Sequence, residues 1–159
     1  ENNIVATDLK DNWTMYLPVM LVSFVGMLPM IILAEKYHKH KTMILTAISI
    51  MIMSQILFYQ TPLTYTTFFI LLTLFFIAFN AMEAMLPSLI SKTATSAKRG
   101  LAMGMYSTSQ FLGAFIGGVF GGWIYNTYGL NSVFLFTTLM AIIWWGIMLT
   151  MQQQKPTGE

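Results

Sequence analysis

The stretch Asn80–Trp123, NAMEAMLPSLISKTATSAKRGLAMGMYSTSQFLGAFIGGVFGGW, decides the fold of this chain. It joins two long apolar runs through one short basic turn, SKTATSAKR. The first run carries an acidic residue, Glu83, deep inside it, and the second is rich in glycine. An acid within an apolar helix, a basic turn and a helix built for close packing together predict a membrane transport protein.

The composition supports an integral membrane protein. The 159 residues are 56% hydrophobic and only 9% charged, whereas a soluble domain carries about 25% charged residues. The apolar residues form long runs without a helical or strand period, which is typical of membrane helices. The net charge of +2 implies no nucleic-acid partner, because the basic residues lie in turns between apolar runs.

The composition also argues against a metal or thiol site. The chain has no cysteine, which excludes disulfides and thiolate chemistry. Its two histidines, His38 and His40, share a lysine-rich turn and form no metal-ligand set. We therefore expect no cofactor and no metal.

The apolar runs predict an all-α, polytopic transmembrane bundle, because each is close to the roughly 20 residues that a membrane helix needs. A polar segment at 1–12 comes first, and a polar tail at 152–159 comes last. The transmembrane domain, 13–151, contains five predicted helices at about 13–34, 42–59, 65–90, 100–125 and 132–151.

The basic residues of the turns predict the orientation of these helices. The turns after the first, third and fifth helices carry Lys or Arg, and the turns after the second and fourth carry none. By the positive-inside rule the basic turns are cytoplasmic, so the N-terminus lies outside and the C-terminus inside. The chain starts at Glu1, outside and without a signal sequence, and we expect it to be a fragment of a longer protein.

Glu83 is the first candidate for a functional residue. A carboxylate in hydrocarbon is expensive, so it is normally paired, faces a cavity or is protonated. Asn80 is three residues earlier, on the same helix face, and Pro87 removes the amide that would bond to the Glu83 carbonyl. One interpretation is a cavity site for protons or a cationic substrate. The alternative is a structural carboxylate bonded to a neighbouring helix, or one that water reaches from the cytoplasmic interface.

The fourth run carries two further features. Its glycines form two interleaved series at small-xxx-small spacing, which predicts close packing against another helix: Gly113, Gly117 and Gly121, and Gly118 and Gly122. Ser107 and Gln110 share one helix face. They could line a polar path, or they could form interhelical hydrogen bonds.

The first turn, EKYHKHK, offers a gating interpretation. Glu35 could pair with a basic residue or a helix end in one conformational state, and Lys36, Lys39 and Lys41 are the basic candidates. The alternative is an ordinary positive-inside loop.

No pattern supports an enzyme. The sequence has no glycine-rich phosphate loop before a helix, no paired carboxylates, and no Ser/His or metal-ligand set.

The stretch MEAMLPSLISKTATSAKRGLAMGMYSTSQFLGAFIGGVFGGWI resembles the major facilitator superfamily. It is similar to the second half of bacterial drug:proton antiporter-type members, and closest to the YajR-type branch. The resemblance rests on E-x-x-L-P-S-L-I-S-K, on G-x-A-M-G-x-Y-S-T-S-Q-F-L-G and on G-G-x-x-G-G-W, and it covers nearly all of the chain after the polar N-terminus.

The resemblance implies that the five helices are the eighth to twelfth of a twelve-helix transporter of the bacterial inner membrane. Asn80 and Glu83 would then border the central cavity, and Gly113, Gly117 and Gly121 would lie between the two halves. The turn at Glu35 would hold the weaker copy of the family's gating motif. The N-terminal half and the seventh helix have no counterpart in this sequence, and five helices cannot enclose an alternating-access cavity.

The sequence therefore predicts part of a proton-coupled efflux transporter for small hydrophobic or cationic solutes. Its expected partners are the lipid bilayer, the missing N-terminal half, the substrate and protons. A rival hypothesis is a small non-transporting membrane protein that assembles through its glycine face. A third is a non-functional fragment.

Overall fold

The computed structural model describes residues 13–37, 39–61 and 64–151, with the side chains of 13–15 left aside. The predicted polar segment 1–12, the tail 152–159 and one of the two histidines, His38, lie outside the described residues.

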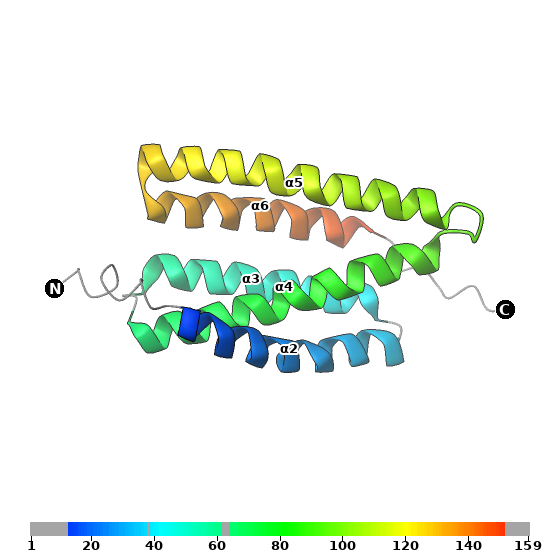
Figure 1. Cartoon of the computed structure of the whole chain (residues 1–159), viewed down its shortest axis with the longest axis horizontal. Coiled ribbons are helices and arrows are strands. Elements are labelled where there is room, and N and C mark those ends of the chain that lie inside the picture. Colours follow the sequence, from blue (N-terminus) through cyan, green and yellow to red (C-terminus); the bar gives the residue numbers. More distant parts are fainter. Residues whose placement is uncertain (1–12, 38, 62–63, 152–159) are drawn as a thin grey trace.

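The described chain consists of five α-helices joined by short turns (Figure 1). In chain order they are α2 (Trp13–Lys36), α3 (His40–Gln60), α4 (Tyr65–Thr93), α5 (Arg99–Tyr128) and α6 (Leu130–Thr150). The described residues contain no strand. The predicted fold class, an all-α bundle of five long helices, is confirmed.

Most helices extend up to three residues beyond the apolar runs that predict them, and α6 ends one residue earlier than expected. The apolar runs mark where side chains prefer hydrocarbon, whereas the helical backbone continues until its end groups find other hydrogen-bond partners. The prolines Pro18, Pro29 and Pro87 lie inside α2 and α4 without ending either helix. A proline is tolerated inside a membrane helix because neighbouring helices, side chains or water can satisfy the carbonyl that it frees.

Four of the described helices are long and apolar enough to span a membrane, namely α2 from Tyr16, α3, α4 and α6. The remaining helix, α5, has 30 residues, but its many glycine, serine and threonine residues lower its apolarity. The helix α5 nevertheless runs across the bundle, because it connects the C-terminal end of α4, at one side of the bundle, to the N-terminal end of α6, at the opposite side. Figure 1 shows α5 running beside α6 over the length of the bundle.

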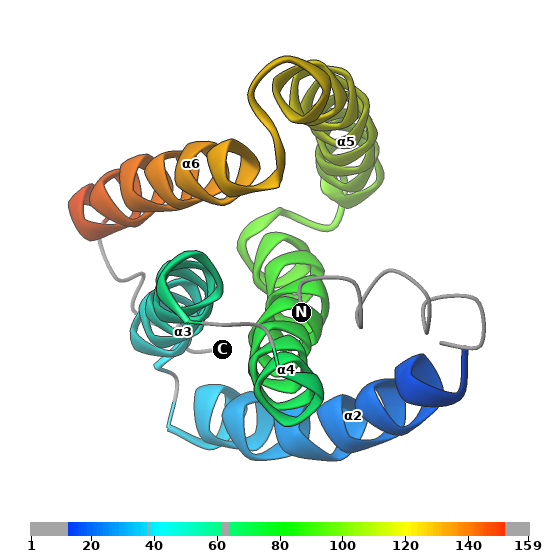
Figure 2. The ribbon, with the colours of Figure 1, turned by 90° about the vertical axis from the view of Figure 1, so that its left-hand side faces the viewer.

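The core lies between α2, α3, α4 and α6. Figure 2 shows α4 between α2 and α3, with α6 beside α3 and α5 farthest from α2. The buried cluster draws on these four helices, through Ala34, Ile44, Ala47, Ile48, Ala78, Ala81, Met82, Met85 and Met148. In α5 the buried residue is Ile124. The fifth helix therefore packs at the edge of the bundle.

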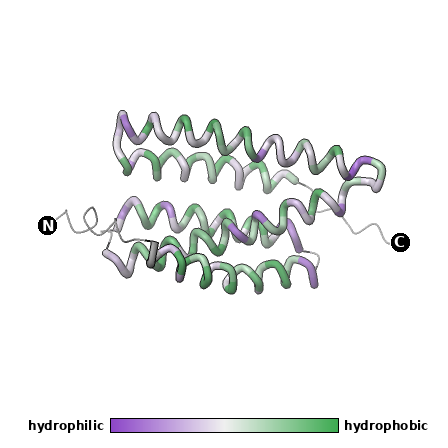
Figure 3. The backbone as a smooth tube through the Cα atoms, viewed as in Figure 1, coloured by the Kyte–Doolittle hydropathy of each residue, from purple (hydrophilic) through white to green (hydrophobic). Residues whose placement is uncertain are grey.

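Polar contacts bring the basic turns to the same end of the molecule. Glu35 at the end of α2 pairs with Lys92 at the end of α4, and Lys41 reaches the end of α6. Figure 3 shows mostly hydrophobic helices, with hydrophilic residues at helix ends and turns and at a few positions inside the helices. This arrangement fits the positive-inside interpretation, in which these ends are cytoplasmic. At the opposite end Gly129, with φ 82°, makes the tight turn from α5 to α6 that glycine adopts readily.

Candidate functional site

Glu83 and Gln110 form the polar contact between α4 and α5. The Gln110 side-chain amide Nε2 donates a hydrogen bond to Glu83 Oε1 at 2.8 Å. Glu83 is exposed and Gln110 is half-buried in this chain. The sequence singles out both residues separately, and the structure brings them together.

Asn80 points to a different neighbour. Its Nδ2 donates to Ser23 Oγ of α2 at 3.0 Å, and the Ser23 hydroxyl in turn donates to the Met20 carbonyl at 2.9 Å. Ser23 is fully buried. Asn80 and Glu83 therefore do not act on one shared group here: Asn80 joins α4 to α2, and Glu83 joins α4 to α5.

The surroundings of Glu83 combine polar and apolar groups. Pro87 lies four residues later inside α4, so the Glu83 carbonyl lacks its usual helical donor. Phe79 lies one turn earlier and is partly exposed. A carboxylate, a freed carbonyl and an aromatic ring on one side of a helix suit a cationic or amphipathic ligand.

Glu35 is held by α4. Ser88 Oγ donates to Glu35 Oε1 at 3.0 Å, and Lys92 forms an ion pair with Glu35 Oε2. The partner of this predicted gating acid thus comes from α4 rather than from its own turn. Ser88 and Ser23 were not predicted as site residues. The sequence feature that could have identified these two serines is a hydroxyl group inside a run of apolar residues.

The three lysines of the first turn have different surroundings. The Lys41 ammonium donates to the Leu149 carbonyl at 2.8 Å and to the Met151 carbonyl. Lys36 lies 5.8 Å from the centre of the Tyr37 ring, within cation–π range. Lys39 is exposed and forms no side-chain hydrogen bond with the described residues. Of the three lysines, Lys41 is the one that joins two helices far apart in the sequence, α3 and α6.

The glycine series of α5 meets no partner helix within the described chain. A Cβ added at any of these positions has no atom within 4 Å of it, which holds for Gly113, Gly117, Gly118, Gly121 and Gly122. Their packing role stays a prediction about a partner helix. The close approach between described helices is at Gly26 of α2, where an added Cβ lies 2.6 Å from Ile77 Cδ1.

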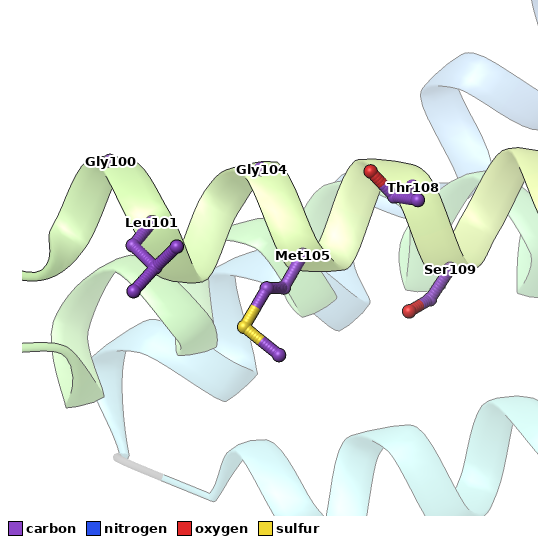
Figure 4. Close-up of a pocket in the computed structure, with 6 residues that line it drawn as sticks. All are labelled: Gly100, Leu101, Gly104, Met105, Thr108 and Ser109. Carbon is purple, nitrogen blue, oxygen red and sulfur yellow. The ribbon is translucent and has the colours of Figure 1, made fainter.

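An open groove of 660 Å³ runs along the first half of α5 (Figure 4). Its lining residues are Gly100, Leu101, Gly104, Met105, Thr108 and Ser109. Leu101 is nine positions from Gln110, about two and a half helical turns, which places it on the opposite side of α5. Neither Glu83 nor Gln110 lines the groove.

The described residues contain no group of three His, Asp or Glu side chains that could hold a metal ion. Within the described part of the chain, the polar contacts between helices are hydrogen bonds and one ion pair.

Comparisons with known proteins identify the family. The sequence model of the Major Facilitator Superfamily matches residues 5–159. The inner membrane transport protein YajR of Escherichia coli (strain K12) is 39% identical over 143 residues, which are 90% of this chain and 32% of YajR. An uncharacterised transporter of Buchnera aphidicola subsp. Acyrthosiphon pisum is 34% identical over 109 residues, 69% of this chain and 28% of that protein.

The chain spans about a third or less of the length of the curated relatives it matches. The family match nevertheless covers nearly the whole chain, and the described helices are those of a multi-pass membrane protein. These findings place the chain among inner-membrane proteins of a transporter family rather than among enzymes. It belongs to the Major Facilitator Superfamily.

Proposed function

We propose that these helices serve in proton-coupled efflux of small hydrophobic or cationic solutes by alternating access. Glu83 would take up and release the proton, and Gln110 would orient its carboxylate. The observation that carries this proposal is the Glu83–Gln110 hydrogen bond of 2.8 Å between α4 and α5.

The position of Glu83 supports a role beyond structure. The other described charged residues lie in turns or near helix ends, whereas Glu83 lies ten residues before the end of α4. Its partner is a neutral amide, so its negative charge is hydrogen-bonded without being neutralised. Such a carboxylate inside a membrane bundle favours binding a proton or a cation.

The surroundings of this carboxylate support the proposed solute class. Phe79 lies one helical turn before Glu83 and is partly exposed, and Phe111, which follows Gln110 in α5, is exposed as well. An aromatic face attracts cations, while apolar side chains favour hydrophobic solutes. A lipophilic cation would contact both kinds of group.

A second transmembrane half is the proposed partner. The chain covers 32% of YajR, and the described α5 exposes large apolar side chains such as Phe111, Phe115 and Trp123. A helix this exposed is suited to contact with another bundle or with lipid. We propose that the other half covers α5 and closes the cavity, and that Glu35 and Lys92 control the cytoplasmic ends.

Substitution of Glu83 tests the proposal. Glu83→Gln keeps the shape and removes the titratable group, so proton-coupled efflux of a lipophilic fluorescent cation from inverted vesicles should be lost, with unchanged protein amount in the membrane. Ser49→Ala, which removes the 3.1 Å hydrogen bond from Trp145 between α6 and α3, should transport normally. Unchanged efflux by Glu83→Gln at every pH removes Glu83 from the mechanism.

The open glycine positions of α5 favour a second candidate function. Because no described atom approaches them, the chain could assemble with copies of itself as a non-transporting membrane protein. Gly117→Leu would then abolish cross-linking between copies, while Gly146→Leu in α6 would leave it intact. Cross-linking that survives Gly117→Leu excludes assembly through this face.

A further inference from the structure

The helix α5 is attached to the bundle differently from the other four. Every residue of the buried core cluster comes from α2, α3, α4 or α6. In α5 the buried residue is Ile124, near its C-terminal end. The half of α5 that contains Gln110 is therefore held by little apolar packing.

Side-chain hydrogen bonds show the same division. Two pairs of helices are each joined by more than one side-chain hydrogen bond. Asn80–Ser23 and Ser88–Glu35 join α4 to α2, and α3 is joined to α6 by Lys41–Leu149, Thr138–Gln55 and Trp145–Ser49. Among the described residues, α5 has one such tie to another helix, Gln110–Glu83. Its connections through the chain are the turn after α4 and Gly129, whose φ is 82°.

The strength of that tie depends on the charge of Glu83. An amide that donates to an ionised carboxylate makes a charge-assisted hydrogen bond, about twice as strong as a bond between neutral groups. When the carboxyl group is protonated, one oxygen becomes a donor and the attraction falls to the neutral level. One proton at Glu83 therefore weakens the one side-chain hydrogen bond that joins α5 to another described helix.

We propose that Gln110 senses the charge of Glu83, so that α5 is held against α4 while Glu83 is ionised and moves away when Glu83 is protonated. Gln110 is in this sense a positioning residue. The inference rests on the proposed function in one respect, namely that Glu83 takes up a proton. It adds the element that responds and the residue that transmits the change.

Few other titratable groups face this contact. On α5, Tyr106 lies one turn before Gln110 and is half-buried. In the described parts of α2, α3, α4 and α6, the remaining charged groups are near helix ends, at Glu35, Lys36, His40, Lys41 and Lys92. Glu83 is thus the one carboxyl group at this depth among the described residues.

Distances between spin labels test the inference. This chain has no cysteine, so Ile70→Cys in α4 and Val119→Cys in α5, both at exposed positions, provide a labelled pair. Met53→Cys in α3 with Ile70→Cys is the reference pair, because α3 and α4 both contribute to the buried core cluster. The measurements use the full gene product, with any cysteine outside this chain replaced by serine, in lipid nanodiscs over a range of pH.

We expect the α4–α5 distance to lengthen as the pH falls, while the α3–α4 reference distance stays constant. Glu83→Gln should show the long distance at every pH, and Gln110→Leu should lose the pH dependence. Thr138→Val, which removes the tie between α3 and α6, should behave as the unmodified protein. A pH-independent α4–α5 distance in the unmodified protein, or pH dependence that persists in Gln110→Leu, overturns the inference.

The two proposals fail in different experiments. Loss of efflux in Glu83→Gln together with a pH-independent distance in the unmodified protein overturns this inference and leaves the proposed function standing. Normal efflux in Glu83→Gln overturns the proposed function. The α4–α5 spin-label distances then decide by themselves whether α5 moves when the charge of Glu83 changes.

Discussion

Lys41 at the start of α3 donates a hydrogen bond to the Leu149 carbonyl in the last turn of α6, at 2.8 Å and across 108 positions of sequence. The last carbonyls of a helix lack internal partners and carry a partial negative charge. A lysine supplied by another helix satisfies them here, since α6 has no basic residue in its last turn. The first turn therefore fixes the end of α6 as well as the start of α3.

Lys41→Met should destabilise the bundle by about 1 kcal/mol, because it removes this cation from the end of α6. The unfolding midpoint in mild detergent should fall, and proteolysis near the end of α6 should become faster. Lys39→Met removes an equal charge from the same turn without breaking a described hydrogen bond and should change neither quantity. If both substitutions lowered the stability equally, the cause would be the change in net charge and not the loss of the Lys41 hydrogen bond.

Exchanging Glu35 and Lys92 should preserve the link between α2 and α4. Each single change, Glu35→Lys or Lys92→Glu, places like charges together, and the double exchange restores an attractive pair. Because both side chains are well exposed, the coupling should be about 0.5 kcal/mol and should weaken with salt. A double-mutant cycle of unfolding at low and high salt measures it. Additive single effects would show that the pair contributes nothing.

Asn80→Leu and Ser23→Ala should each destabilise the α2–α4 contact, because each removes one partner of the same hydrogen bond at 3.0 Å. Such bonds between membrane helices contribute about 0.6 kcal/mol on average. The double variant should lose no more than the larger single loss. We also expect Asn80→Leu to retain efflux, since Asn80 contacts α2 and not the Glu83 pair. If Asn80→Leu lost efflux but kept normal stability, Asn80 would have to be part of the proton or substrate site.

Gly26→Ala should destabilise the protein by about 1–3 kcal/mol, as overpacking does in a well-packed contact. The new Cβ would lie 2.6 Å from Ile77 Cδ1 and 2.7 Å from Ile77 Cγ1, so the Ile77 side chain has to move. Shortening that side chain, Ile77→Ala, should rescue part of the loss. Gly146→Ala in α6 is the matched control, because nothing lies within 4 Å of its added Cβ. If Gly26→Ala left the stability unchanged, the Ile77 side chain would have room to adopt another rotamer.

The candidate site could be predicted only in part. The sequence singles out Glu83 because a charge inside an apolar run is costly, and Gln110 because it is polar in a membrane helix. It does not predict that these two side chains meet. Asn80 and Glu83 are close along one helix, yet Asn80 bonds to α2 and Glu83 to α5. Such partners depend on how helices pack.

The sequence by itself determined the five helices, their approximate ends and the family. This was possible because each membrane helix satisfies its backbone within its own segment, so that apolar length and flanking charge are local signals. Tertiary structure alone decided the partners: Lys92 for Glu35, the end of α6 for Lys41, Ser23 for Asn80 and Gln110 for Glu83. These pairs join residues at least 27 positions apart, and only the packing of whole helix faces determines which polar groups come within hydrogen-bonding distance.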